Sequence, residues 1–251
     1  MREDYYQEYF EVEDRHWFFV ARRRILLALL ESHVGLAPDG SQRRLIDFGC
    51  GPGAILGELQ RFGEVEAVDV DERAIEFCRR RGFENLTLLE GDHLPFPDSS
   101  FSIATSLDVF EHIEDDLGAM RELARVLEPG GSLLAAVPAH PWMWGPQDEV
   151  SGHVRRYTAR GLRSRLEDAG FSIERMTYFN TWLFPPIALT RLIRRLLPSR
   201  GEPRSDLQMT KEGPLNSLLT HVFGSEARWL RRHDLPFGVS LAALARRDAR
   251  P

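Results

Sequence analysis

The chain has 251 residues and a net charge of −6, and 43% of its residues are hydrophobic and 28% are charged. This composition indicates a globular protein long enough for one full α/β domain, and it excludes a disordered or fibrous chain. The acidic, aromatic N-terminus does not resemble a signal peptide, no apolar stretch approaches the ~20 residues of a membrane span, and two cysteines make no disulfide framework, so we expect a cytoplasmic protein.

The first predicted element is a helical arm. Between Trp17 and Leu30 the apolar residues recur at helical spacing, which predicts that residues 5–33 are helical. A loop rich in Gly, Pro and Asp follows. We take residues 1–40 as an N-terminal arm of a single domain over residues 1–251, and this arm either closes over a ligand or packs against a sheet.

The next segment is the most informative one. An apolar run that begins at residue 45 ends in Asp47 and breaks into Gly49, Gly51 and Gly53. A strand that leads into a Gly-rich turn and a helix lets backbone approach a nucleoside-bearing ligand. A phosphate-binding loop would need a Lys-Ser or Lys-Thr pair after the last glycine, and none is there; a dinucleotide turn is matched only loosely. The Asp47 carboxylate would repel a pyrophosphate but attract an ammonium group or ribose hydroxyls.

Three further strands end in polar residues. The second ends in Asp69, and an acid at this place can accept hydrogen bonds from both ribose hydroxyls. The third leads into Asp92 and His93, and the fourth, residues 101–107, leads into Asp108. These side chains are expected at one edge of a sheet, where a ligand would meet them.

Helices are expected between these strands at residues 53–61, 72–81 and 115–127, and a fifth strand at residues 132–137 follows a Glu-Pro-Gly-Gly turn. This alternation of strand and helix predicts a parallel sheet.

Beyond residue 137 the pattern is less regular. Residues 138–157 predict a long loop, which is followed by a helix that Thr158 caps and Gly170 ends, and by a sixth strand at residues 171–179. Residues 181–235 predict a helical insert, and the residues after it, 236–251, a last strand and tail. Within these segments we place a break at Pro185 and Pro186, an amphipathic helix at 187–197, a helix at 215–232 and the strand at 237–245.

Three motifs occur together in this order and spacing: D-F-G-C-G-P-G at residues 47–53, G-D-H-L-P-F at residues 91–96 and E-P-G-G at residues 128–131. With them the chain resembles class I S-adenosylmethionine-dependent methyltransferases, in particular the methyltransferase type 11-like group, over about residues 44–180. The resemblance implies a doubly wound, mostly parallel seven-stranded sheet of the Rossmann-like methyltransferase fold. It also implies that the last strand pairs antiparallel, and that S-adenosylmethionine is the cofactor.

The resemblance also implies roles for individual residues. Asp47 and Gly49 would meet the methionine end of the cofactor, and Asp69 the ribose. Asp92 and His93 would meet the adenine edge, and Val70 the adenine face. The full cofactor-binding set that we expect is Asp47, Gly49, Gly51, Asp69, Val70, Asp92, His93 and Leu107.

Methyl transfer from a sulfonium needs alignment and, for some acceptors, removal of a proton. His112 follows the fourth strand, near the expected methyl group, and is a candidate base; alternatively it only shapes the pocket. Asp108, Glu111 and His112 could together ligate a divalent cation, but we assign no metal.

The loop before residue 158 carries a second group of candidates. Residues 152–158, G-H-V-R-R-Y-T, resemble an element of a bacterial methyltransferase subgroup that also has a His-Trp-Phe-Phe-like segment, here residues 16–19. In one interpretation His153 and Tyr157 contact the acceptor or cofactor and are catalytic. In the other, Asp148, His153 and Arg156 form a structural clasp that holds the loop.

The sequence thus predicts an enzyme that transfers a methyl group to a small-molecule or lipid-like acceptor. An apolar wall with a basic rim would suit a substrate that has a hydrophobic body and an anionic or polar head; we place in this wall Trp142, Trp144, Phe179, Trp182, Leu183 and Phe184, and in the rim Arg191, Arg194 and Arg195. Alternatively, these apolar residues bury the helical insert against the sheet. The basic residues gathered in 151–251 are compatible with peripheral membrane contact. No Arg cluster is interleaved with aromatic residues, so we expect no nucleic-acid partner. The alternatives are a non-catalytic S-adenosylmethionine-binding regulatory domain and a nicotinamide-dependent oxidoreductase.

Overall fold

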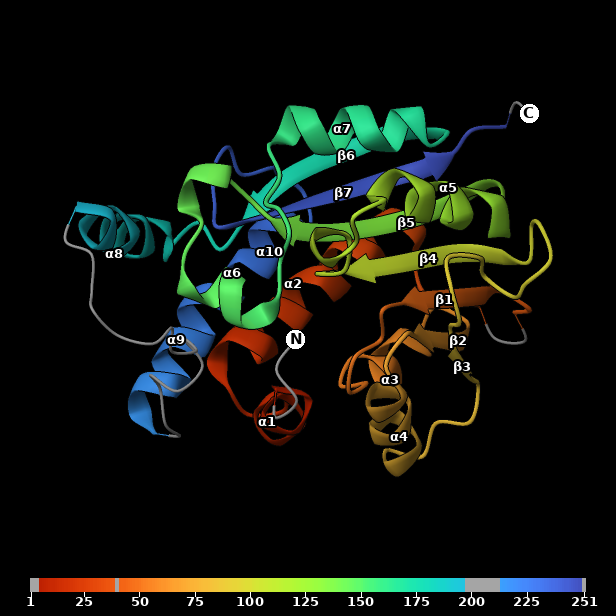
Figure 1. Cartoon of the computed structure of the whole chain (residues 1–251), viewed down its shortest axis with the longest axis horizontal. Coiled ribbons are helices and arrows are strands. Elements are labelled where there is room, and N and C mark those ends of the chain that lie inside the picture. Colours follow the sequence, from red (N-terminus) through yellow and green to blue (C-terminus); the bar gives the residue numbers. More distant parts are fainter. Residues whose placement is uncertain (1–4, 39–40, 197–212, 250–251) are drawn as a thin grey trace.

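The computed structural model describes residues 5–38, 41–196 and 213–249. Its centre is a seven-stranded sheet with the order β3-β2-β1-β4-β5-β7-β6 (Figure 1). The strands are β1 (Arg44–Phe48), β2 (Glu64–Asp69), β3 (Leu86–Leu88), β4 (Phe101–Leu107), β5 (Leu127–Pro138), β6 (Phe171–Phe179) and β7 (Ser240–Arg247). Neighbours from β3 to β5 pair in parallel, and β7 is antiparallel to both β5 and β6. The prediction of a mostly parallel seven-stranded sheet is confirmed.

Helices cover both faces of this sheet. The helices of the core are α2 (Trp17–Val34), α3 (Leu56–Leu59), α4 (Glu72–Arg80), α5 (Asp116–Val126), α7 (Ala159–Asp168), α9 (Pro214–Gly224) and α10 (Glu226–Leu230). On one face, Leu123 of α5 and Leu166 of α7 are fully buried in the same apolar cluster. On the other face, Ile25 of α2 and Phe223 of α9 are buried together. The doubly wound arrangement follows from these two separate cores.

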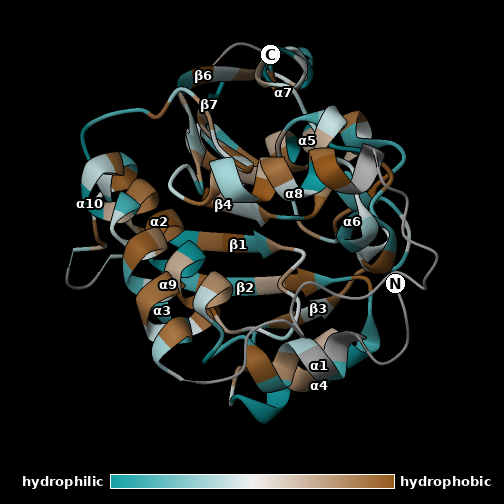
Figure 2. Cartoon of the chain, turned by 90° about the vertical axis from the view of Figure 1, so that its left-hand side faces the viewer, coloured by the Kyte–Doolittle hydropathy of each residue, from teal (hydrophilic) through white to brown (hydrophobic). Residues whose placement is uncertain are grey.

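The carboxyl ends of the parallel strands meet at one edge. In Figure 1 the arrows of β4 and β5 point toward this edge, where α6 (Pro146–Ser151) and α8 (Phe184–Leu196) lie. Figure 2 views the molecule from that side and shows α8, with both hydrophobic and hydrophilic segments, in front of the sheet. Segments that are far apart in the chain therefore gather where a parallel sheet presents its ligand site.

Several predicted helix boundaries were wrong. Pro185 and Pro186 do not break the insert; they lie in the first turn of α8, where a helix tolerates proline because the missing N–H would have no partner there. The helix predicted at 215–232 is divided at Ser225 into α9 and α10. The segment between residues 197 and 212 lies outside the described residues.

The predicted loop at residues 138–157 differs from the structure, and the predicted helical arm divides into two helices. The loop contains α6 and a short 3-10 helix, η2 (Pro141–Met143). The arm forms two helices, α1 (Tyr5–Val12) and α2, and the side chain of His16 caps the second by accepting a hydrogen bond from the amide of Phe18. The chain therefore turns before α2, which places α1 and the start of α2 beside the carboxyl edge of the sheet.

Candidate functional site

A cavity of about 920 Å³ lies at this edge. The ends of β1, β2 and β4, the N-terminal arm, the loop after α6 and helix α8 all contribute to its lining. Among the predicted site residues, those that line it are Asp47, Gly49, Gly51, Asp69, Val70, Leu107, His112 and His153. The structure thus brings most of the predicted cofactor residues and two predicted catalytic residues together.

Asp47 lies at the end of β1 with only 2% of its surface exposed. The hydroxyl of Thr105, on the neighbouring strand β4, donates a 2.5 Å hydrogen bond to its Oδ1. Burial raises the pKa of Asp47 to about 6, although the Thr105 bond acts in the opposite direction. Because burial disfavours the ionised form of Asp47, a ligand that brings a positive charge would stabilise this carboxylate and bind favourably here.

Asp69 shapes the glycine turn. Its Oδ2 accepts a 2.9 Å hydrogen bond from the amide of Gly51, and its Oδ1 accepts one of 2.9 Å from the amide of Asp71. Burial raises the pKa of Asp69, and the hydrogen bonds from backbone amides offset part of that rise. Each carboxylate oxygen keeps a second lone pair, so both can still accept a ligand hydroxyl.

The turn leaves room for a ligand. A Cβ built on Gly51 meets no other atom within 4 Å, whereas one on Gly49 would collide with the side chain of Val109. Both glycines have a positive φ, +55° and +78°, which favours glycine at each position. Val70 lines the same space and is 69% exposed. An open cradle beside an exposed apolar side chain and two carboxylates fits an adenosyl group that also carries positive charge.

Asp92 and His93 are not among the residues that line the cavity. The imidazole of His93 is paired instead with Glu122, at 2.9 Å between Nδ1 and Oε2, and its side chain is 73% exposed. Their predicted contact with the adenine edge stays a prediction. Leu89, which the sequence did not single out, lines the cavity from the same segment.

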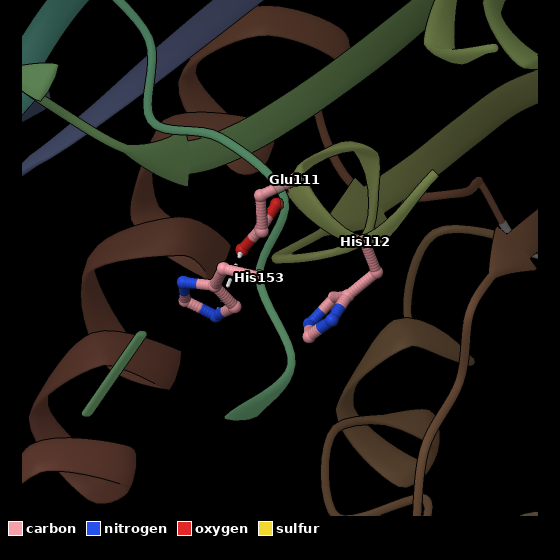
Figure 3. A group of neighbouring side chains, drawn as sticks. All are labelled: Glu111, His112 and His153. Carbon is pink, nitrogen blue, oxygen red and sulfur yellow. Dashed lines mark ion pairs between the residues drawn. The ribbon is translucent and has the colours of Figure 1, made fainter. Parts of the chain in front are cut away.

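Glu111, His112 and His153 form a cluster at another part of the lining (Figure 3). Glu111 and His112 belong to the 3-10 helix η1 (Phe110–His112) after β4, and His153 comes from the segment after α6. Figure 3 shows the ion pair between His153 and Glu111, which are 4.0 Å apart between Nε2 and Oε1. The rings of His112 and His153 meet edge to face, with 4.8 Å between their centroids.

The protonation of this cluster is set mainly by burial. Burial, and next the neighbouring His153, lower the pKa of His112 to about 4, so its ring is neutral at pH 7 and a weak base. Burial also raises the pKa of Glu111, and the charge of Asp108 adds to this rise. The predicted catalytic roles of His112 and His153 remain predictions.

The predicted clasp around Asp148 is present. The Oδ1 of this buried carboxylate lies 2.8 Å from Nδ1 of His153 and accepts a 2.7 Å hydrogen bond from Nε of Arg156. Its Oδ2 accepts a bond from the amide of Gly145. The two interpretations of His153 are therefore compatible, because Nδ1 serves the clasp while the ring still lines the cavity.

Tyr157 does not line the cavity. It is 4% exposed, and its hydroxyl donates hydrogen bonds of 2.6 Å to Oδ2 of Asp116 and 3.1 Å to the carbonyl of Phe110. Burial raises its pKa above the usual range, so the phenol stays protonated. These contacts tie the loop to η1 and α5.

The arm supplies residues that the sequence did not assign to the site. Arg22 of α2 lies 2.8 Å from Asp108 in an ion pair, and Trp17 and Phe19 line the cavity. Arg81 donates a 2.8 Å hydrogen bond to Glu13 and one of 2.8 Å to the carbonyl of Pro52, in the glycine turn. The arm both packs on the sheet and covers the cavity. The sequence held one signal for this role of the arm: Phe18 and Arg22 are four residues apart, so they lie on the same face of a helix.

None of the six apolar residues predicted as a wall lines the cavity, namely Trp142, Trp144, Phe179, Trp182, Leu183 and Phe184. Trp142, Trp144 and Trp182 are 40–47% exposed and do not line the cavity. Its apolar lining from these segments comes instead from α8, through Pro186 and Ile187. The orientation of α8 depends on its tertiary packing, which hydrophobicity alone does not fix.

Comparison with known protein families supports a single assignment. The model of the family described as "Methyltransferase domain" matches residues 46–135. An uncharacterized methyltransferase of Schizosaccharomyces pombe is 30% identical over 215 residues, which cover 74% of this chain and 77% of that protein.

Two further relatives share a shorter region. A protein of Mycobacterium tuberculosis named as a probable S-adenosylmethionine-dependent methyltransferase is 33% identical over 143 residues, which are 54% of this chain and 51% of that protein. A demethylmenaquinone methyltransferase of Tropheryma whipplei is 32% identical over 135 residues, 52% of this chain and 51% of that protein. The match therefore spans about half the length of these two relatives.

Among solved structures, a SAM-dependent methyltransferase of Archaeoglobus fulgidus superposes with a TM-score of 0.62. The alignment covers 97% of this chain and all of that one, at 18% identity. At this level of identity the likeness concerns the fold.

Proposed function

The chain belongs to the S-adenosylmethionine-dependent methyltransferases, and from this premise we propose that it transfers a methyl group from S-adenosylmethionine to a small-molecule or lipid-like acceptor. One observation carries the proposal. The single cavity of about 920 Å³ contains the carboxylates of Asp47 and Asp69 around a glycine turn, and it continues to the imidazoles of His112 and His153. A cofactor cradle and a second, chemically different compartment thus share one space, as transfer between two bound molecules requires.

The cofactor compartment accounts for binding. Asp47 would attract the positive charge of the methionine end, and Asp69 would accept hydrogen bonds from the ribose hydroxyls. Val70 offers an exposed apolar surface to the adenine, and the space beside Gly51 admits the ligand. Bound S-adenosylmethionine supplies an activated methyl group, so these residues need only hold and orient it.

The acceptor compartment has apolar and polar walls. Trp17, Phe18 and Ile187 line the same cavity as the two histidines, and we assign them to this compartment. Apolar walls with a few convergent polar groups suit a small molecule with an apolar body. The Tropheryma whipplei relative is named a demethylmenaquinone methyltransferase, and a quinone of this kind is such a molecule. As the acceptor atom bonds to the methyl carbon, the bond from that carbon to the sulfonium sulfur would break and leave S-adenosylhomocysteine. The proton of the acceptor would leave toward the cluster of Glu111 and the two histidines.

The location is part of the proposal. Across the described ranges, no helix combines the length and apolar character needed to cross a bilayer. Both cysteines are free and buried, although their sulfur atoms are 3.8 Å apart, which supports a reducing, cytoplasmic environment.

Calorimetry followed by a transfer assay tests the proposal. We expect one S-adenosylmethionine to bind per chain, and radiolabelled methyl from the cofactor to appear in an organic extract when phenolic or quinol-like acceptors are added. His153→Ala should lower turnover strongly while cofactor affinity stays within a few-fold. Cofactor binding without transfer to any acceptor would support the regulatory-domain alternative, and binding of a nicotinamide cofactor instead would contradict the assignment.

A further inference from the structure

Glu111 is the most unusual buried group in the cavity wall. Its side chain has 0% exposure, and within the described residues neither carboxylate oxygen has a hydrogen-bond partner. Burying a carboxylate without hydrogen bonds costs free energy. The contact with His153 does not supply a hydrogen bond, because 4.0 Å between Nε2 and Oε1 is too long. Because Glu111 lines the cavity, a ligand entering from the cavity could reach its oxygens.

The two histidines beside it present free ring nitrogens. Nδ1 of His153 lies 2.8 Å from the Asp148 carboxylate, and Nδ1 of His112 lies 3.3 Å from the carbonyl of Gly152. A carbonyl or carboxylate oxygen can only accept, so each Nδ1 carries a proton, and Nε2 is the atom with which the neutral ring would bind a cation. Metal-ligating histidines are held in this way, with the other nitrogen donating to a carboxylate or a backbone carbonyl.

The three side chains converge. One ligand atom from each of Glu111, His112 and His153 lies within 4.8 Å of the others (Figure 3). With metal–ligand bonds of about 2.1 Å in tetrahedral geometry, ligand atoms lie about 3.4 Å from each other. The side chains would therefore need to close by roughly 1–2 Å, which small side-chain rotations provide.

We propose that Glu111, His112 and His153 bind a divalent transition-metal cation such as Zn²⁺ or Co²⁺, with the remaining coordination positions open to the cavity. Two imidazoles and one carboxylate suit this class of metal. The nearby cations Arg22 and Arg156 are each held in an ion pair with another carboxylate, Asp108 and Asp148 respectively.

This site differs from the one that the sequence suggested. The sequence grouped Asp108 with Glu111 and His112, but the structure gives Asp108 to Arg22 and brings His153 from the next loop in its place. His153 was then counted as a base or a clasp residue. As a metal ligand it would keep its bond to Asp148, which would orient the ring.

The inference deepens the proposed function and rests on it for the role of the metal. A cation at the acceptor end of the cavity would bind an acceptor oxygen and favour loss of its proton to solvent, because Glu111 and the two histidines would then be occupied as ligands. The acceptor class would then be a hydroxyl compound, with oxygen as the methylated atom.

Metal binding can be tested without any methyl transfer. The purified chain is stripped with a chelator and titrated with Co²⁺ and with Zn²⁺, without cofactor, by visible absorbance and calorimetry. We expect one cation per chain. His112→Ala and Glu111→Gln should weaken binding at least tenfold, and Asp148→Asn, which removes the carboxylate behind His153, about 10–100-fold.

His221→Ala is the matched control, because His221 is exposed on α9 and does not line the cavity, and its affinity should equal that of the wild type. Circular dichroism checks that each variant is folded. Absence of stoichiometric binding, or unchanged affinity in folded His112→Ala and Glu111→Gln, would overturn the inference.

The measurements distinguish failure of the metal site from failure of the proposed methyl transfer. Cofactor binding and methyl transfer in the fully chelated enzyme, with no cation bound, would overturn only the metal site. Tight cation binding in a chain that binds no S-adenosylmethionine would support the metal site and overturn the proposed function.

Discussion

The carboxylate of Asp69 accepts a 2.9 Å hydrogen bond from the backbone amide of Gly51, so the end of β2 holds the turn that follows β1. Asp69→Ala should remove charge-assisted bonds to the ribose worth roughly 1.5–3 kcal/mol. We expect S-adenosylmethionine affinity to fall about ten- to a hundred-fold, measured by calorimetry.

The matched control for this change is Asp98→Ala. Asp98 pairs with Arg125 on the surface and lies outside the cavity lining, so its loss should leave affinity unchanged. If a folded Asp69→Ala variant binds the cofactor as tightly as the wild type, Asp69 does not contact the ribose.

Gly51 tests the cradle itself. Its φ is +55° and a Cβ there points into open space within the cavity wall. Gly51→Val should abolish detectable cofactor binding by filling that space, and the positive φ should cost about 1–2 kcal/mol of stability. Gly82→Val is the control, because Gly82 also has a positive φ and an open Cβ position but lies outside the cavity lining. Equal cofactor affinity in both variants would mean that the turn is not the cradle.

The parts of the fold that the sequence predicted are those with local signals. Apolar runs that end in Asp47 and Asp69 mark strand ends directly, and Thr158 does cap α7 by accepting a hydrogen bond from the amide of Gly161. The glycine turn was equally readable, because a positive φ favours glycine at Gly51. Such features depend on neighbours within a few residues.

The parts that the sequence missed depend on tertiary contacts. Arg22 meets Asp108 only because α2 crosses the end of β4, and His153 meets Glu111 only because α6 turns the loop back over the sheet. The exposed tryptophans were misplaced for the same reason: hydrophobicity indicates which residues prefer burial, but not which of them face the cavity.

Tyr157→Phe separates a structural role from the catalytic role that was one interpretation of the sequence. Removing a buried hydroxyl that donates to the Asp116 carboxylate should cost about 1.5–3 kcal/mol in the free energy of unfolding, measured by denaturant titration. Activity per folded molecule should stay near that of the wild type, because Tyr157 does not line the cavity.

The control here is Tyr178→Phe, since the Tyr178 hydroxyl has no hydrogen bond within the described residues. We expect a change of no more than about 0.5 kcal/mol. A large loss of turnover in a stable Tyr157→Phe variant would restore the catalytic interpretation.

Asp47 should make cofactor binding depend on pH. Burial raises its pKa to about 6, so below that value the unliganded protein holds a proton there. A cationic ligand needs the ionised carboxylate. Its affinity should therefore fall as pH drops below 6, by at most about tenfold per pH unit, and should level off above pH 6.

The stability of the unliganded protein should change in the opposite sense. Because the folded pKa lies above the ordinary value of 3.8, the contribution of Asp47 to stability is present at low pH and is lost as pH rises from about 4 to 6.

Burial also raises the pKa of Asp69. The variant Asp47→Asn therefore separates the titration of Asp47 from that of Asp69. The variant should bind S-adenosylmethionine more weakly at pH 7.5 and should lack the step in affinity near pH 6. Its free energy of unfolding, relative to the wild type, should rise between about pH 4 and 6, because an amide cannot ionise in the buried site. Calorimetry and denaturant titration across this range give both measurements. An affinity profile in Asp47→Asn that keeps the wild-type step would assign the titration to another group and would remove Asp47 from the methionine end of the cofactor.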